Sequence, residues 1–254
     1  YLIFDLRYGL RALAAPTGLA ALLSLGFATL IFPDTIEPLV PALQNSFWLT
    51  THVSFCFIGY AAFAIAYVLC LLFLMKRRDW HRWAACYVAS LSLTAMLAGV
   101  VGVHLQRSGT VTMGLNAVTA AVFIVACVAA AAVFTPLLSF LVRLLRLDGE
   151  LVEGGLIDTV MHQTIVLGFL FLSVGIITGS VWAHQAWGRL WGWDPKETWS
   201  FITWIVYGIY LHLRFGWRTK GPLTIWFAVF GFWAVIFTYF GVNFLLAGLH
   251  SYGS

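Results

Sequence analysis

The chain has 254 residues, of which 61% are hydrophobic and only 9% are charged. A soluble domain carries roughly 25% charged residues, so this composition excludes an ordinary soluble domain and predicts an integral membrane protein. The formal net charge of +4 follows from basic residues near the expected membrane surfaces and gives no indication of nucleic-acid binding.

Seven apolar runs are long enough to cross a bilayer, whose hydrocarbon core needs roughly 20 helical residues. The runs are apolar on every face, without the alternation of a β-barrel strand, so helices must satisfy the backbone in lipid. We therefore expect an all-α, polytopic protein with about seven transmembrane helices in a single membrane domain, residues 1–254. The expected spans are residues 10–31, 51–75, 84–104, 115–141, 158–183, 199–215 and 222–247.

The distribution of Lys and Arg predicts the orientation of these spans. If the N-terminus lies inside, 11 of the 14 Lys and Arg residues fall on inner segments. The positive-inside rule then places the connection between the fifth and sixth spans on the outer face.

Two of the expected spans contain no residues that suggest a catalytic or binding role. Residues 84–104 and 115–141 form a plain apolar hairpin that we expect to be scaffold. The cysteines also lack a chemical pattern, because they fall inside spans without Cys-x-x-Cys spacing and are best explained by packing. They are Cys56, Cys70, Cys86 and Cys127.

The connection at residues 182–199, which we call the Trp-rich segment, reads WAHQAWGRLWGWDPKETW. Tryptophan favours the membrane–water interface, so an aromatic belt is one explanation. The density of indoles, interrupted by Gly188, Gly192 and Pro195, favours a shaped apolar shelf for a large planar ligand. The indoles are those of Trp182, Trp187, Trp191, Trp193 and Trp199.

Two histidines share a membrane face with this segment. His52 begins the second span and His250 ends the seventh, so both lie on the same side as the Trp-rich segment in either orientation. Two imidazoles can ligate a haem iron from opposite faces, and Arg189 and Lys196 could pair with the haem propionates. The alternative is that both histidines are merely interfacial.

His212 lies deeper, 13 residues after Trp199 and about 20 Å along the helix, too far for the same iron. Trp204, Gly208 and His212 form an i, i+4, i+8 row, in which the glycine could leave space for a flat ligand. A second haem position is one reading, and a packed or water-bonded histidine is the other. Only His162 has a similar depth, so a partner protein could supply the opposite ligand.

The charged residues at the end of the Trp-rich segment have two possible interpretations as well. Asp194, Lys196 and Glu197 could act as an acid/base group. Alternatively, Asp194 before Pro195 begins the sixth helix, with Glu197 in its first turn.

The stretch WGRLWGWDPKETWSFITWIVYGIYLHLR, residues 187–214, resembles the "WWD" signature of haem-handling proteins of cytochrome c biogenesis. The continuation DPKETW and the span ending in YLHLR are similar to the CcsA (ResC) proteins of the System II pathway. Related CcmC and CcmF proteins carry other residues after the Asp. The segments WLTTHVSFCFIGYAAF, GVNFLLAGLHSYG, APTGLAALLSLGFATL and TIVLGFLFLSVGIITGSVWA resemble CcsA too, so the resemblance covers most of the chain apart from about residues 80–145.

The resemblance implies the haem-handling subunit of a holocytochrome c synthase, acting with a CcsB (ResB) membrane partner. Such a pair carries haem b across the membrane and presents it at the outer face, where Cys-x-x-Cys-His thiols of apocytochrome c add to the vinyl groups. By position, His52 and His250 match the outer ligands, and His212 matches a transmembrane histidine whose opposite ligand is thought to lie on CcsB. The residues that match the signature itself are Trp187, Trp191, Trp193 and Asp194.

Two features depart from the family pattern. Family members usually have further N-terminal spans, and the hairpin at 84–141 looks like an insertion. The resemblance implies a bacterial cytoplasmic or thylakoid membrane, with the Trp-rich segment on the periplasmic, extracytoplasmic or lumenal side. Alternatives are a CcmC-like haem chaperone or exporter without ligation activity, and a b-type electron-transfer subunit.

Overall fold

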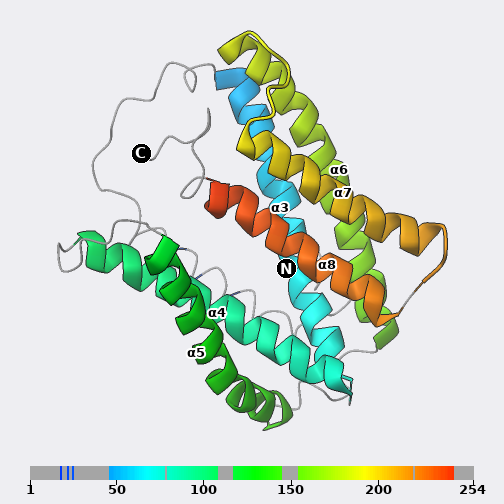
Figure 1. Ribbon diagram of the computed structural model, residues 1–254. Helices are drawn as coiled ribbons and strands as arrows, with labels where there is room; N and C mark the ends of the chain where they lie inside the picture. The colour runs from blue at the N-terminus through cyan, green and yellow to red at the C-terminus, as the bar shows by residue number, and fades with distance from the viewer. Residues whose placement is uncertain are drawn as a thin grey trace. The chain divides into compact units, whose positions relative to one another are not determined.

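The computed structural model describes residues 46–77, 79–107, 117–144, 154–219 and 221–242, together with residues 18, 22 and 25. These parts are helical apart from short connections (Figure 1), so the all-α prediction is confirmed. The helices are α3 (Ser46–Met75), α4 (Trp80–Arg107), α5 (Ala117–Leu144), α6 (Gly154–Trp187), α7 (Pro195–Phe215) and α8 (Pro222–Ile236), followed by a π-helical turn, η3 (Phe237–Gly241).

Four helices in the described part of the chain are long and apolar enough to cross a membrane: Phe47–Met75, Val122–Leu144, Gly155–Trp187 and Pro222–Tyr239. The chain is therefore a multi-pass membrane protein. The runs expected at 84–104 and 199–215 are helical as well, within α4 and α7. Of the run expected at 10–31, only residues 18, 22 and 25 are described, and the end of the run at 222–247 lies outside the described residues.

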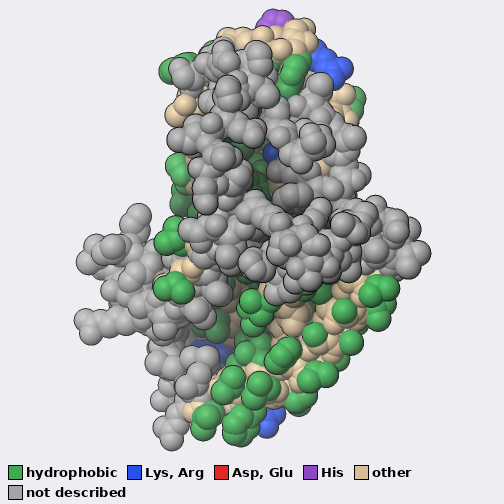
Figure 2. Space-filling model, turned by 90° about the vertical axis from the view of Figure 1, so that its left-hand side faces the viewer, with side chains coloured by type: hydrophobic (Ala, Val, Ile, Leu, Met, Phe, Trp, Pro, Cys, Tyr) green, Lys and Arg blue, Asp and Glu red, His purple; other side chains and the backbone are tan. Residues whose placement is uncertain are grey.

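The chain divides into two compact units, and the hairpin at 84–141 falls in the first, which comprises Tyr1–Glu37 and Met75–Glu153. Within this unit α4 and α5 pack along each other, and the Thr94 hydroxyl donates to the Cys127 carbonyl over 3.3 Å. Large apolar side chains of α5 such as Val125 and Val133 are exposed, as expected of a surface that lipid covers. Hydrophobic side chains also cover much of the described surface in Figure 2.

The connection before α4 contains a charged turn. The Arg77 guanidinium donates to the Asp79 carboxylate, with 2.9 Å between Nε and Oδ2. Asp79 also accepts from the backbone N–H of His81, so its carboxylate caps the start of α4. The hydrogen bond from Arg77 holds the pKa of Asp79 below its usual value.

The second unit comprises Pro38–Leu74 and Gly154–Ser254, and its helices α3 and α6 lie antiparallel in one fixed register. Three glycines of α6 let α3 side chains approach its backbone closely: a Cβ at Gly179 would lie 2.7 Å from the His52 ring, one at Gly175 2.7 Å from the Cys56 sulfur, and one at Gly168 2.8 Å from the Phe63 ring. Further along, the Cys70 sulfur lies 3.2 Å from that of Met161. Small residues at such positions allow helix backbones to pack closely in membranes.

Aromatic rings connect α3 with α7 and α8. Phe63 of α3 is fully buried and stacks on Tyr207 of α7, with ring centroids 3.7 Å apart and an interplanar angle of 6°. Tyr67 stacks similarly on Phe232 of α8. These contacts place the core of the unit between α3, α7 and α8.

Polar contacts hold α6 and α7 together along their length. The Trp204 indole N–H donates to the Ser173 hydroxyl over 2.8 Å. Toward the other end of α7, Arg214 and Asp158 form an ion pair at 2.8 Å. Both side chains are largely buried, with exposed fractions of 6% for Arg214 and 13% for Asp158.

Candidate functional site

The Trp-rich segment connects α6 to α7 through a short turn (Figure 1). Gly188 ends α6 with a φ of 74°, and Trp193 has a φ of 54°, a left-handed conformation that is uncommon for a residue other than glycine. The chain then reaches Asp194 and begins α7 at Pro195.

Asp194 and Glu197 form a capping box at the start of α7. The Asp194 carboxylate accepts from the Lys196 N–H over 3.2 Å, and Glu197 accepts from the N–H groups of Gly192 and Asp194 at 2.7 and 3.2 Å. These bonds satisfy donors that the first turn of a helix leaves without intrahelical partners. The structure thus shows the capping arrangement for both acidic residues.

We expect Asp194→Ala to lower stability by about 0.5–2 kcal/mol, because the cap is lost. Asp194→Asn should retain most of that stability, because asparagine caps helices equally well. The measurement is thermal unfolding in one detergent, followed by helical circular dichroism. Equal losses in both variants would contradict a role in capping.

Indoles of the Trp-rich segment pair edge to face. Trp182 and Trp187 have centroids 4.8 Å apart and planes at 70°, and Trp191 and Trp193 are 5.7 Å apart at 90°. Trp199 packs on η3, with centroids 4.2 Å apart. The turn between α6 and α7 separates these groups, because it reverses the chain between Trp187 and Trp191.

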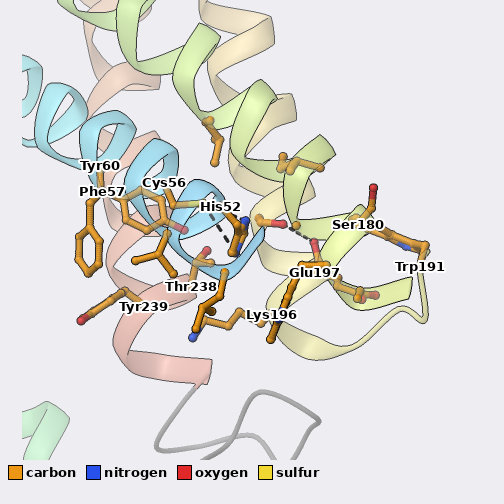
Figure 3. Close-up of a pocket in the computed structure, with 18 residues that line it drawn as sticks. His52, Cys56, Phe57, Tyr60, Ser180, Trp191, Lys196, Glu197, Thr238 and Tyr239 are labelled. Carbon is orange, nitrogen blue, oxygen red and sulfur yellow. Dashed lines mark hydrogen bonds between the residues drawn. The ribbon is translucent and has the colours of Figure 1, made fainter. Parts of the chain in front are cut away.

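A cavity of about 190 Å³ lies beside the Trp-rich segment, between α3, α6, the start of α7 and η3. Figure 3 shows side chains from these elements around it. The residues around it include Leu49, His52, Cys56, Tyr60, Trp182, Trp191, Lys196, Glu197 and Tyr239. His52 and Trp191 therefore reach one site, as their common membrane face predicts.

His52 is held by α6. Its Nδ1 lies 2.8 Å from the Gly175 carbonyl oxygen, which can only accept, so Nδ1 carries the proton and Nε2 of the neutral ring carries the lone pair. The imidazole lies almost parallel to Trp182, at 8° and 6.1 Å between centroids. The ring is thus presented in the tautomer in which Nε2 can bind a metal.

The two basic residues of the Trp-rich segment lie differently. Lys196 lines the cavity, and burial lowers its pKa, while Cys56 and Asp194 act in the opposite direction. Arg189 is exposed, and its guanidinium packs over Gly192, where a Cβ would lie 2.5 Å from Nε. Of the two, Lys196 is the one in contact with the cavity.

Several residues around the cavity were not among the predicted site residues. Cys56 and Tyr60 follow His52 at i+4 and i+8, so they share its helix face, and this spacing could have indicated them. Tyr239 comes from η3 and packs near both Phe57 and Tyr60. No sequence signal indicated Tyr239, because π-helical turns have no simple periodicity.

The other histidines have different outcomes. His250 lies outside the described residues. His212 is exposed on α7, near Trp217 at 6.2 Å between centroids, whereas His162 packs near Tyr210 and Phe215. The space expected next to Gly208 faces α6, because a Cβ there would lie 3.8 Å from the Phe169 ring.

Comparison with known proteins matches residues 1–250 to the family described as cytochrome C assembly protein. The chain belongs to this family. It is 38% identical to the cytochrome c biogenesis protein CcsA of Microcystis aeruginosa over 233 residues, 89% of this chain and 65% of the relative. CcsA of Synechococcus sp. strain CC9605 is 35% identical over 95% of this chain and 67% of the relative. CcsA of Prochlorococcus marinus strain MIT 9515 is 35% identical over 91% and 62%.

These similarities make the chain a CcsA-type member of the cytochrome c assembly family. The chain spans about two thirds of the length of these CcsA relatives, and slightly less in two of the three.

The residues around the cavity of this CcsA-type chain have chemistry compatible with one edge of a haem. His52 offers the metal-binding nitrogen, the Trp182 and Trp191 indoles offer apolar walls, and Lys196 offers a cation for a carboxylate. The volume of about 190 Å³ is below the roughly 300–1,000 Å³ of pockets that enclose a small molecule. A bound porphyrin would therefore extend beyond the mouth of this cavity.

Proposed function

We propose that this CcsA-type chain holds haem b beside the Trp-rich segment and presents it for cytochrome c maturation. The observation that carries the proposal is the position of His52, which lies in one cavity with Trp191 and Lys196 and has its Nδ1 bonded to a backbone carbonyl. A histidine ligand usually donates its second ring N–H to such an acceptor. His52 would then hold the haem iron through Nε2.

His250 is the second axial ligand in this proposal. The basis is its position in the sequence, which puts it on the membrane face of His52 and the Trp-rich segment. Imidazoles from two spans would bind the iron from opposite sides of the porphyrin.

The propionates of the haem pair with basic residues of the Trp-rich segment. Lys196 is the first candidate because it lines the cavity, and a carboxylate near its ammonium would counteract the burial that lowers the pKa of Lys196. Arg189 is the second, since its exposed guanidinium can form bidentate pairs with carboxylates. In this proposal Trp187, Trp193 and Trp199 support the edge of the haem that carries the propionates. Asp194, as the cap of α7, keeps the start of that helix in place beneath this edge.

The deeper histidine has a separate role in the proposal. His212 is exposed on α7, so it can contact a haem shared with another membrane protein. That partner is a CcsB-type subunit, which supplies the opposite ligand. This arrangement explains why an ionisable side chain lies exposed on a helix in the membrane.

The chemistry of the complex is positioning. Two Cys thiols of a Cys-x-x-Cys-His motif in apocytochrome c would add across the two haem vinyl groups, so that each S–H bond and the π bond of each vinyl group are replaced by a C–S and a C–H bond. The orientation favoured by the basic residues puts this step on the periplasmic, extracytoplasmic or lumenal side. The chain binds and orients the haem, and apocytochrome c supplies the thiols.

The experiment replaces His52 with alanine in the full chain co-expressed with its CcsB-type partner. We expect the spectrum of the outer haem to be lost from the purified complex and partly restored by added imidazole, which occupies the vacated ligand position, while the deeper haem at His212 is unaffected. His184→Ala is the matched control, because His184 is an exposed residue at the end of α6. An unchanged spectrum in His52→Ala would refute the ligand assignment.

The reconstituted complex also discriminates among activities. Thioether formation on an apocytochrome c is expected of a synthase, whereas bound haem without thioether formation would indicate a CcmC-like chaperone. Stable haem that exchanges electrons without any apocytochrome product would indicate a b-type electron-transfer subunit.

A further inference from the structure

We propose that α6 sets the orientation and protonation of His52, with Gly179 and Gly175 as positioning residues for the haem ligand. This inference rests on the proposed function, since it assigns a role to residues that act through His52. Neither glycine belongs to the Trp-rich segment, and both lie on the face of α6 that packs against α3.

Gly179 provides the space that the imidazole occupies. A Cβ at this position would lie 2.7 Å from both Cε1 and Nδ1 of His52, closer than non-bonded atoms approach. Any larger residue would therefore push the ring away from α6. Trp182, one turn further along α6 and nearly parallel to the imidazole, borders the ring there.

Gly175 provides the carbonyl that accepts the hydrogen bond from His52. Its carbonyl oxygen lies 2.8 Å from His52 Nδ1, whereas the nearby Thr178 hydroxyl lies closer to the Val174 carbonyl, at 2.8 Å, than to that of Gly175, at 3.1 Å. The approach is possible because Gly175 has no side chain: a Cβ would lie 2.7 Å from the Cys56 sulfur, one turn below His52 on α3. Two adjacent close contacts thus bring a backbone carbonyl within reach of the ring.

The consequence for the ligand follows from general metal chemistry. A hydrogen bond from Nδ1–H to a carbonyl fixes the tautomer and makes the metal-binding nitrogen more basic. A more basic axial ligand stabilises the ferric iron and lowers the reduction potential of the haem. The α6 backbone would therefore influence how easily the presented iron is oxidised.

The test compares Gly179→Ala with Gly168→Ala in the full complex. Both variants add a methyl group to the same face of α6, at 2.7 Å from His52 and at 2.8 Å from Phe63 respectively. We expect Gly179→Ala to weaken haem retention about 10–100-fold, as removal of supporting partners of a metal ligand commonly does, and to shift the potential of the remaining haem to more positive values. Gly168→Ala should leave the haem spectrum and potential unchanged.

A second variant tests Gly175. Gly175→Ala places a methyl group 2.7 Å from the Cys56 sulfur and moves the carbonyl away from His52, so the potential should shift to more positive values. An unchanged potential in Gly175→Ala would overturn the role of the Gly175 carbonyl. Equal haem loss in Gly179→Ala and Gly168→Ala would overturn the role of Gly179.

These outcomes are distinct from failure of the proposed function. If His52→Ala retains its haem, the ligand assignment fails. If His52→Ala loses its haem while Gly179→Ala behaves like Gly168→Ala, only the positioning role fails.

Discussion

Asp158→Ala is expected to lower the free energy of unfolding by about 3–5 kcal/mol, because it removes one partner of a buried ion pair. Arg214 is only 6% exposed and lies 2.8 Å from Asp158. Its Nη1 and the Asp158 Oδ1 already have no further hydrogen-bond partner among the described residues. Without the carboxylate, the guanidinium would remain a charge in an apolar surrounding.

A double variant separates the cost of an isolated charge from the value of the pair. Asp158→Leu combined with Arg214→Met should be close to wild type in stability, since apolar replacement of a whole buried pair is often neutral. Thermal unfolding of all variants in the same detergent provides the measurement. A double variant as unstable as Asp158→Ala would show that the pair itself, and not the orphaned charge, accounts for the loss.

Phe63→Ala is expected to be similarly destabilising, by about 3–5 kcal/mol, because it leaves a cavity in the core of the bundle. The ring is fully buried, stacks on Tyr207 at 3.7 Å between centroids and fills the space over Gly168. Its removal therefore affects contacts with α6 and α7 together.

Leu170→Ala is a suitable control for this prediction, because Leu170 lies on α6 two residues after Gly168 but is 57% exposed. Its effect should be much smaller. Combination with Gly168→Ala adds a further check, since the added methyl group enters space that the Phe63 ring has vacated. The double variant should then lose less stability than the two single losses added together, whereas strict additivity would argue against contact between these positions.

The apolar runs predicted the described helices but not their ends. The second span was expected from residue 51, whereas α3 begins at Ser46, and the run at 158–183 became α6, Gly154–Trp187. Hydropathy identifies the part of a helix that lies in hydrocarbon, while caps and turns determine where the helix itself ends. Asp194 was recognised as a possible start of the sixth helix because Pro195 follows it and Glu197 lies in the first turn, where the helix dipole favours an acid.

The site was predictable only where the order of the chain determines it. The order of the spans along the chain predicted that His52 and the Trp-rich segment lie on the same membrane face, and residues of both line the cavity. The order of the spans does not determine which face of α3 points inward, and α3 is apolar all round. Cys56 and Tyr60 can be recognised only once His52 is taken as a site residue, because they follow it at i+4 and i+8. The same limit applies to Gly208, because the sequence does not show which helix its small side faces. In the structure the space expected there is bordered by Phe169 of α6.

The three glycine contacts on α6 also determine which helical alignments are possible. If α6 slipped by one turn along α3, Gly175 would face His52, and a glycine would still receive the imidazole. Phe63 would then face Thr164 in place of Gly168, and a β-branched side chain there would collide with the ring. Cys56 would likewise face Phe171 in place of Gly175, so the close contacts of Phe63 and Cys56 together exclude a slip of one turn in this direction.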